Sequence, residues 1–598
     1  MENTEVKKIM LKGGEFLIKE TVPSSVFIPE DYSEEQLMVA SAAKEFIEQH
    51  VQPNLEKLEK HDIELCKKLL ELSGEYGLLG TGIPEEYGGT GQDFITNSLL
   101  TEVNSAAFSF ALTMGAHTGI GTLPILYFGT EAQRAQYLPK LATGQLKAAY
   151  CLTEPDSGSD ALAAKTKAIL SEDGKHYILN GQKMWITNGG LADIFVVFAK
   201  INGTDFTGFI VESGYEGLTR GKEETKLGIK GSSTCQIFFE NVKVPIENVL
   251  GVIGKGHRIA FNILNIGRIK LAAGVVGGSK VASTASIRYA NERHQFKRPI
   301  GSFGAIKHKL AEQAIRTYSV ASATYRTCGN IQHEEERLLG NGKSYGQSLL
   351  GAAEEFAIEC ALLKVAGSEV LDYVVDEAVQ IHGGIGYSEE GPIARGYRDA
   401  RINRIFEGTN EINRMLAVDM LLKRTMKGKI ELIAAAQAVQ KELLTPPSFG
   451  SSNNGELFAE ELKAVQNMKK ATLLVAGATT QKLMAELQEE QEILMYISDM
   501  MADAFIAESV LLRTRKLVEQ RGESACANQL DIMRVFVSDA MERLGSNGRK
   551  ALRAWAENDE LRMLLLGLKR FTKFEGINTK NARRRIADTL LEANEYCF

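Results

Sequence analysis

The sequence has few cysteines and no large excess of charge of one sign. Its 7 cysteines are scattered over 598 residues, and none forms a C-x-x-C pair or lies at zinc spacing from a histidine. This pattern excludes a disulfide scaffold and a zinc module, and we expect no metal site. A net charge of -7 provides no concentrated basic footprint, so we expect no nucleic-acid partner. The one dense basic run, Arg583-Arg584-Arg585, fits a solvated helix face better than an anion site.

Long hydrophobic runs and targeting signals are also missing. No apolar stretch reaches the roughly 18 residues of a membrane span. The N-terminus, Met1 to Lys12, mixes Glu and Lys and matches neither a secretory signal nor a transit peptide. We therefore expect a soluble, cytoplasmic protein. The stretch from Ile430 to Ala436 is typical of a core-facing helix, and a membrane-surface helix with peripheral contact is the weaker alternative.

The periodicity of apolar residues divides the chain into five segments. Helical spacing predicts an N-terminal helical domain (1–148) and a helical bundle (257–427). Between them, short β-branched and aromatic segments separated by turn residues predict a β domain (149–256). A linker (428–455), rich in Gly, Ser, Pro and Asn after residue 445, precedes a C-terminal helical domain (456–598). The expected fold is mainly α with a central antiparallel β domain and an additional C-terminal helical domain.

Two segments of the β domain fit a flavin site. They are 150–160 (YCLTEPDSGSD) and 181–190 (GQKMWITNGG). An isoalloxazine ring needs hydrogen bonds along one edge and a flat apolar surface beside it, which Thr153, Thr187 and Trp185 can supply. The Gly-Ser turn at Gly158 and Ser159 lets backbone N–H groups approach a pyrophosphate. Each segment alone could be only a turn between strands, but their joint presence favours a cofactor site.

At these residues the sequence resembles the acyl-CoA dehydrogenase family. The family patterns Y-C-x-T-E-P-x-x-G-S-D and K-x-W-I-T-N match 150–160 and 183–188. Further matches are R-x-x-F at 293–296, Q-I-x-G-G-x-G at 380–386 and E-G-T at 407–409. The matches are collinear from about Tyr32 to Ala417, and they explain why no Rossmann fingerprint is present. The resemblance extends to the very-long-chain branch, which carries a C-terminal helical extension.

The resemblance implies FAD as cofactor and assigns roles to individual residues. The residues implied to line the flavin near its ring are Tyr150, Leu152, Thr153, Gly158, Ser159, Trp185, Ile186, Thr187, Thr409 and Asn410. Across a dimer interface, Arg293, Gln295, Phe296, Gln380, Gly383 and Gly384 would hold the pyrophosphate and adenine. The substrate contacts would be Ser159, Asn265, Arg268 and Gly408. For Arg268, a purely structural role on a helix is the alternative.

Glu407 is the expected catalytic base. It follows Ile405 and Phe406, and apolar surroundings raise a carboxyl pKa and strengthen the base. In the family this residue removes the α-proton of a fatty acyl-CoA while hydride passes to the flavin, which yields a trans-2-enoyl-CoA. The family also implies that the Glu407 N–H and the flavin ribityl hydroxyl bind the thioester oxygen. Glu411 is the nearest competing carboxylate, and it fits a charge at a helix N-terminus better than a base. A minority of the family carries its base on another helix, and there this sequence has Gly267 instead of glutamate.

Pocket size and partners follow from the same resemblance. Small residues at Ala111 and Gly115 leave a deep acyl pocket, which predicts long-chain substrates. The C-terminal extension predicts a homodimer, and the expected electron acceptor is an electron-transfer flavoprotein. Two alternatives remain open here: an acyl-CoA oxidase that passes electrons to oxygen, and a non-catalytic assembly factor that keeps the fold.

Overall fold

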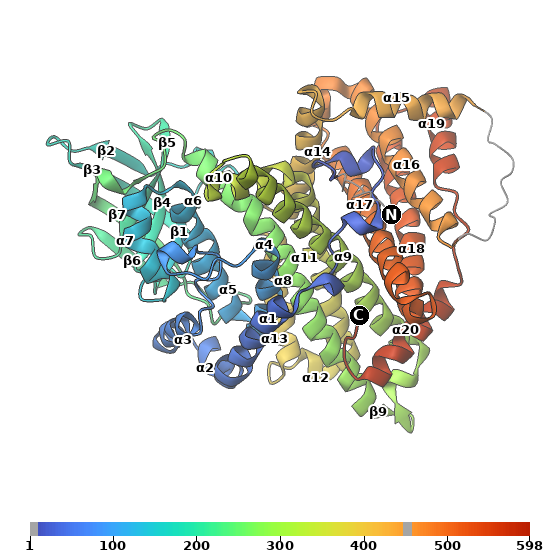
Figure 1. Cartoon of the computed structure of the whole chain (residues 1–598), viewed down its shortest axis with the longest axis horizontal. Coiled ribbons are helices and arrows are strands. Elements are labelled where there is room, and N and C mark those ends of the chain that lie inside the picture. The colour runs from blue at the N-terminus through green and yellow to red at the C-terminus, as the bar shows by residue number, and fades with distance from the viewer. Residues whose placement is uncertain (1–9, 446–456) are drawn as a thin grey trace, which may run out of the picture.

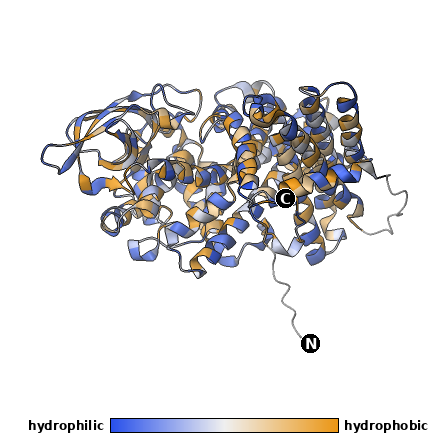
Figure 2. Cartoon of the chain, turned by 90° about the horizontal axis from the view of Figure 1, so that it is seen from above, coloured by the Kyte–Doolittle hydropathy of each residue, from blue (hydrophilic) through white to orange (hydrophobic). Residues whose placement is uncertain are grey.

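The computed structural model describes residues 10–445 and 457–598. A β domain forms one end of an elongated molecule, and helices form the rest (Figures 1 and 2). After the first described residues the chain forms the N-terminal helices, which are α1 (Glu34–Phe46), α2 (Leu55–Glu59), α3 (Ile63–Glu75), α4 (Phe94–Asn104), α5 (Ser109–Ala116), α6 (Leu123–Phe128) and α7 (Glu131–Ala142). Several begin where a side chain satisfies the first free backbone N–H groups. In α4, which lines the functional site, Asp93 accepts from the N–H of Thr96 at 2.6 Å.

The β domain is an eight-stranded sheet in the order β6-β7-β3-β2-β4-β5-β8, with β1 paired to β4. Its strands are β1 (Ala148–Cys151), β2 (Lys167–Leu170), β3 (His176–Thr187), β4 (Ile194–Ile201), β5 (Asp205–Glu212), β6 (Leu218–Glu223), β7 (Thr234–Pro245) and β8 (Val249–Leu250). The sheet is mixed, because β4 pairs in parallel with both β1 and β2. The expectation of an antiparallel β domain is therefore wrong at these two pairs and confirmed at the other pairs of the sheet. A long loop between β1 and β2 lets both strands run in the direction of β4.

Helices of very different length, from 4 to 37 residues, form the centre of the molecule (Figure 1). They are α8 (Gly256–Glu292), α9 (Gly304–Gly340), α10 (Tyr345–Glu355), α11 (Ala357–His382), α12 (Gly384–Tyr387), α13 (Pro392–Ala400) and α14 (Asn410–Met426), with the short hairpin β9 (His294–Gln295) and β10 (Arg298–Pro299) after α8. In the described part of the chain, α8 alone is long and apolar enough to cross a membrane. It packs against α4, α9 and α11 instead, so it is a core helix.

The C-terminal helices continue the central bundle. They are α15 (Leu432–Leu444), α16 (Ala459–Leu483), α17 (Gln491–Arg521), α18 (Ala527–Arg553), α19 (Asn558–Phe571) and α20 (Thr579–Ala593). One cluster of buried hydrophobic side chains runs from α9 and α11 into α16, α17 and α18. Helix α15 lies inside the segment predicted as a linker, and residues 446–455 of that segment lie outside the described residues. The C-terminal helices therefore share the core of the bundle.

Charged residues also join the C-terminal helices to the bundle. Arg583 of α20 is buried, and its Nε donates to Glu312 Oε1 of α9 at 2.7 Å. The interpretation of 583–585 as a solvated face is therefore wrong for Arg583. Sequence periodicity gave no sign of the acidic partner on α9, so the burial of this arginine could not be predicted.

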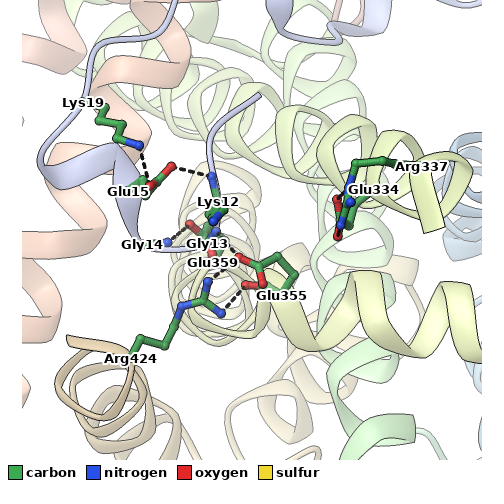
Figure 3. A network of polar contacts seen from close by, with 10 residues as sticks. All are labelled: Lys12, Gly13, Gly14, Glu15, Lys19, Glu334, Arg337, Glu355, Glu359 and Arg424. Carbon is green, nitrogen blue, oxygen red and sulfur yellow. Dashed lines mark hydrogen bonds and ion pairs between the residues drawn. The ribbon is translucent and has the colours of Figure 1, made fainter. Parts of the chain in front are cut away.

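The N-terminal segment is a strap against the helical part of the molecule. Phe16 packs on Phe505 of α17, with ring centroids 4.7 Å apart. The N–H of Gly14 donates to the buried carboxylate of Glu359 at 2.7 Å, as Figure 3 shows. A Cβ on Gly13 would lie 1.9 Å from the carbonyl oxygen of Glu355, so a glycine is required there. The first described residues thus belong to the bundle, although they precede the N-terminal helices in sequence.

Candidate active site

One cavity of about 1430 Å³ opens between the β domain, the N-terminal helices and the central bundle. Thirteen of the predicted site residues line it: Tyr150, Leu152, Thr153, Gly158, Ser159, Trp185, Ile186, Thr187, Asn265, Arg268, Glu407, Gly408 and Thr409. The two β-domain segments and the expected base are therefore brought together, although more than 200 residues of sequence separate Thr187 from Glu407.

Glu407 lies in the loop between a 3₁₀ turn (Arg401–Arg404) and α14. Its Oε2 is buried and has no hydrogen-bond partner among the described residues. Burial raises the pKa of this carboxyl to about 7, and the opposing effects of the Arg268 and Lys364 charges are smaller. A carboxyl with this pKa is poised to accept a proton near neutral pH.

The backbone at Glu407 is strained and is held by side chains. Its φ is 59°, a left-handed conformation that is uncommon outside glycine. The carbonyl oxygen of Glu407 accepts from Arg268 Nε and from Asn413 Nδ2, both at 3.3 Å. Asn413 Nδ2 also donates to the carbonyl of Gly408 at 2.7 Å. These bonds fix the loop in the conformation that directs the carboxylate into the cavity.

Gly267 of α8 faces the carboxylate directly. A Cβ at this position would lie 2.8 Å from Glu407 Oε2. No side chain fits there while Glu407 holds its conformation. The glutamate that the resemblance assigns to this helix position in a minority of the family therefore has no counterpart here. Glu411, the competing carboxylate, is exposed in the first turn of α14 and does not line the cavity.

A buried ion pair joins the two β-domain segments. Lys183 Nζ donates to Glu154 Oε1 at 2.7 Å and to the carbonyl of Leu152 at 3.2 Å. The N–H of Met184 donates to the carbonyl of Thr153 at 3.0 Å. The sequence motifs contain Glu154 and Lys183 as fixed letters, but only the fold shows that they pair. The ion pair holds both segments on one wall of the cavity.

Trp185 reaches the cavity through an irregularity in the sheet. The register of β3 against β7 shifts between Lys183 and Ile186, and Trp185 has a φ of 59°. A bulge of this kind re-aims one side chain out of the strand's alternation. The indole is 54% exposed, so a flat apolar surface is available beside the cavity.

Lys364 and Asn410 lie behind the cavity wall. Lys364 Nζ donates to Asn410 Oδ1 at 2.8 Å, and Asn410 Nδ2 donates to Ser368 Oγ at 3.0 Å. Asn410, which was predicted to lie on the cofactor, does not line the cavity, and its amide bonds to Lys364 and Ser368. Sequence reasoning missed Lys364. A lone lysine within the apolar run of α11 was the available signal, since such a cation must be paired.

Six predicted cofactor residues lie away from the cavity in a single chain. The hairpin after α8 carries Arg293, Gln295 and Phe296, and the end of α11 and start of α12 carry Gln380, Gly383 and Gly384. All six are exposed, and the Phe296 ring is 88% exposed. They are not brought together with Glu407 within one chain.

The part of the cavity between α4, α5 and α8 is open where the sequence has small residues. Ala111 and Gly115 both line it, as predicted. A Cβ on Gly115 or on Gly119 would meet no atom within 4 Å. The cavity therefore has open space at two positions one helical turn apart.

Comparisons with known proteins agree with this geometry. Acyl-CoA dehydrogenase family models match in chain order: the N-terminal domain at 33–145, the middle domain at 149–242, and two C-terminal domain models at 254–422 and 467–570. The chain belongs to the acyl-CoA dehydrogenase family, as its motifs predicted.

Individual relatives refine this assignment. A probable acyl-CoA dehydrogenase of Bacillus subtilis is 45% identical over 98% of both chains. The crystal structure of an acyl-CoA dehydrogenase from Bacillus anthracis complexed with FAD is 47% identical, with a TM-score of 0.96 over 98% of this chain and 100% of that one. The human mitochondrial very long-chain specific acyl-CoA dehydrogenase is 43% identical over 57% of this chain and 51% of its own length. The helical C-terminal part is therefore shared at full length with the bacterial proteins.

Proposed function

We propose that this protein is an FAD-dependent acyl-CoA dehydrogenase that converts long-chain fatty acyl-CoA to trans-2-enoyl-CoA and passes electrons to an electron-transfer flavoprotein. The observation that carries the proposal is the unpartnered carboxylate of Glu407, buried in the cavity that the two β-domain segments line. Burying a carboxyl without a partner costs free energy, and groups of this kind that line a cavity are candidates for a functional role.

The residues of the cavity fit a flavin. Thr153 and Thr187 offer hydroxyls, Trp185 offers a flat ring, and Gly158 has no atom within 4 Å of where a Cβ would lie. The Tyr150 hydroxyl is buried on the same wall without a hydrogen-bond partner among the described residues. FAD would supply a hydride acceptor for the β-carbon of the substrate.

Glu407 supplies the proton acceptor. Once substrate has displaced water, its carboxylate takes the α-proton, and loss of solvent raises its basicity further. The backbone N–H of Glu407 donates to no described residue, so it is free to bind the thioester oxygen as charge develops. Arg268 and Asn413 keep that N–H aimed by holding the carbonyl of the same residue.

The long-chain preference rests on Gly115 and Gly119. Because neither position carries a side chain into the cavity, the pocket extends along the α5 helix and the turn after it. A series of substrates from butyryl-CoA to palmitoyl-CoA tests this preference. Turnover that peaks at butyryl-CoA and is absent with palmitoyl-CoA would contradict it.

A homodimer completes the proposal. The six exposed residues after α8 and around α12 would complete the cofactor site of a second copy, which is why they lie away from the cavity in their own chain. Replacing the exposed Phe296 with Ser should then lower FAD content and shift the protein toward monomer in size-exclusion chromatography. Full FAD content in a monomeric protein would contradict the dimer.

Anaerobic addition of palmitoyl-CoA to the purified protein tests the activity. We expect a yellow protein whose flavin absorbance bleaches. A colourless protein, or a yellow one that no acyl-CoA bleaches, would favour the assembly-factor alternative. Admitting air to the reduced enzyme separates the remaining two, because fast reoxidation with peroxide formation fits an oxidase, whereas slow reoxidation that electron-transfer flavoprotein accelerates fits the dehydrogenase.

A further inference from the structure

Lys270 is a cation on the cavity wall that the reaction does not use. It lies on α8, one turn beyond Gly267, and its side chain lines the cavity. In residues 10–445 and 457–598 it forms no hydrogen bond or ion pair. Burial lowers the pKa of its ammonium group to about 8, and no neighbouring charge offsets that effect. An apolar pocket for a saturated chain gains nothing from such a group, because burying an unpaired cation costs free energy.

Three other cations that line the cavity have partners within the chain. Arg268 Nη1 donates to Asn265 Oδ1 at 2.8 Å, and Lys226 Nζ donates to Thr234 Oγ1 at 2.9 Å. Arg398 Nη1 donates to Glu389 Oε1 at 3.1 Å. Lys270 differs from these because nothing in the described protein neutralises it or accepts its protons.

Helix α4 adds polar groups along the same part of the cavity. Asn97, Thr101 and Asn104 line it at helical spacing, and therefore on one face of α4. The Oδ1 of Asn104 is buried without a hydrogen-bond partner among the described residues. Helix α4 runs close to α8 here, since a Cβ on Gly274 would lie 3.7 Å from Thr101 Cγ2.

The position of Lys270 follows from the helix geometry. Gly267, Lys270 and Gly274 share one face of α8. Gly267 adjoins the Glu407 carboxylate, and Gly274 adjoins α4. Lys270 thus starts between the reacting carbons and the polar face of α4, about 4.5 Å along the axis from Gly267. Lys270 therefore lines the cavity one turn beyond the residue that adjoins the base.

We propose that Lys270 makes the pocket a binding site for acyl-CoA thioesters whose chain ends in a carboxylate, that is, mono-CoA esters of long dicarboxylic acids. This inference rests on the proposed dehydrogenase function. The ammonium group of Lys270 pairs with the terminal carboxylate. Asn104 can donate to that carboxylate only from its Nδ2, because its Oδ1 is an acceptor. The chemistry at the α- and β-carbons is unchanged.

The test compares mono-CoA esters of dicarboxylic acids of different lengths, from octanedioyl-CoA to hexadecanedioyl-CoA, with palmitoyl-CoA on the purified holoenzyme. We expect kcat/KM for the best dicarboxylic ester to be at least equal to that for palmitoyl-CoA. Lys270→Met, which keeps length but removes charge, should lower kcat/KM for the dicarboxylic ester by about tenfold or more and leave palmitoyl-CoA unchanged or improved. Lys270→Arg should restore most of the loss. Lys255→Met, at the exposed start of α8, is the matched control and should change neither value.

Either of two results would overturn the inference: a wild type that rejects the dicarboxylic ester, or a Lys270→Met variant that affects both substrates equally. If that variant does not retain FAD, the wild-type enzyme is tested instead with the dicarboxylic ester and with its neutral ω-amide. Wild type should then have a higher kcat/KM for the acid than for the amide. Equal kcat/KM for acid and amide would count against Lys270. Failure of the dehydrogenase itself is distinguishable, because wild type would then bleach with neither substrate.

Discussion

Replacing Glu407 with Gln removes the proton acceptor and little else. The amide has the shape of the carboxylate, and the bonds that hold the loop go to the backbone carbonyl, which the substitution leaves in place. The variant should therefore fold, retain FAD and bind acyl-CoA. A positioned general base contributes about 10²–10⁴-fold to a proton transfer, so flavin reduction should slow by about that factor.

The assay is anaerobic stopped-flow mixing with palmitoyl-CoA, followed by flavin absorbance, with FAD content measured on the same samples. Glu411→Gln is the matched control, since Glu411 lies one helical turn away, is exposed, and does not line the cavity. It should reduce at the wild-type rate. A Glu407→Gln variant that reduces within about threefold of wild type would refute the assignment of the base.

The pH dependence gives an independent check on Glu407. Its pKa is raised to about 7 by burial, and the ionised form is the active one. The apparent kcat/KM, which reports on free enzyme, should therefore rise with pH through about 7 and level off above it. A profile that is flat between pH 6 and 8 would mean that another group takes the proton.

Two glycine substitutions test the packing around the site and the strap. Gly267→Ala places a methyl group 2.8 Å from Glu407 Oε2, so anaerobic flavin reduction should slow by about 10²-fold. Thermal stability and FAD content should be nearly unchanged. An unchanged rate of flavin reduction would show that the carboxylate can move without loss of activity. Gly13→Ala places a methyl group 1.9 Å from the carbonyl oxygen of Glu355, which should lower the free energy of unfolding by about 1–3 kcal/mol in denaturant titration. Gly340→Ala, where no atom lies within 4 Å, is its control and should be neutral or slightly stabilising.

The parts of the site that could be predicted are those encoded by contiguous residues. Thr153 and Thr187 each lie in a short segment whose residue types already describe the chemistry, and both line the cavity. Glu407 was predicted from the family motif E-G-T at 407–409, and its apolar neighbours supported that assignment. A local pattern of this kind can be predicted because the residues of one strand end or one loop stay together in the folded protein.

The parts that could not be predicted depend on which helix faces meet. The pairing of Lys364 with Asn410 joins α11 to α14. The sequence of neither helix indicates that it packs against the other. The continuity of the core into the C-terminal helices is a similar case. The composition around residue 445 indicated a linker and therefore a separate C-terminal domain. The structure instead packs α16 to α18 on the bundle through tertiary contacts, which composition does not report.

One face of α8 illustrates how a helix can serve two functions at once. Gly267 leaves room for the base, and any larger residue would compete with Glu407 for the same space. One turn later, Lys270 places a charged group in the same cavity where an apolar side chain would contact the acyl chain. Residues three apart on a helix lie on the same face. The residue that adjoins the base and the residue proposed to bind the end of the acyl chain therefore lie on adjacent turns of α8. The identity of residue 270 should therefore alter substrate choice without altering the role of Glu407.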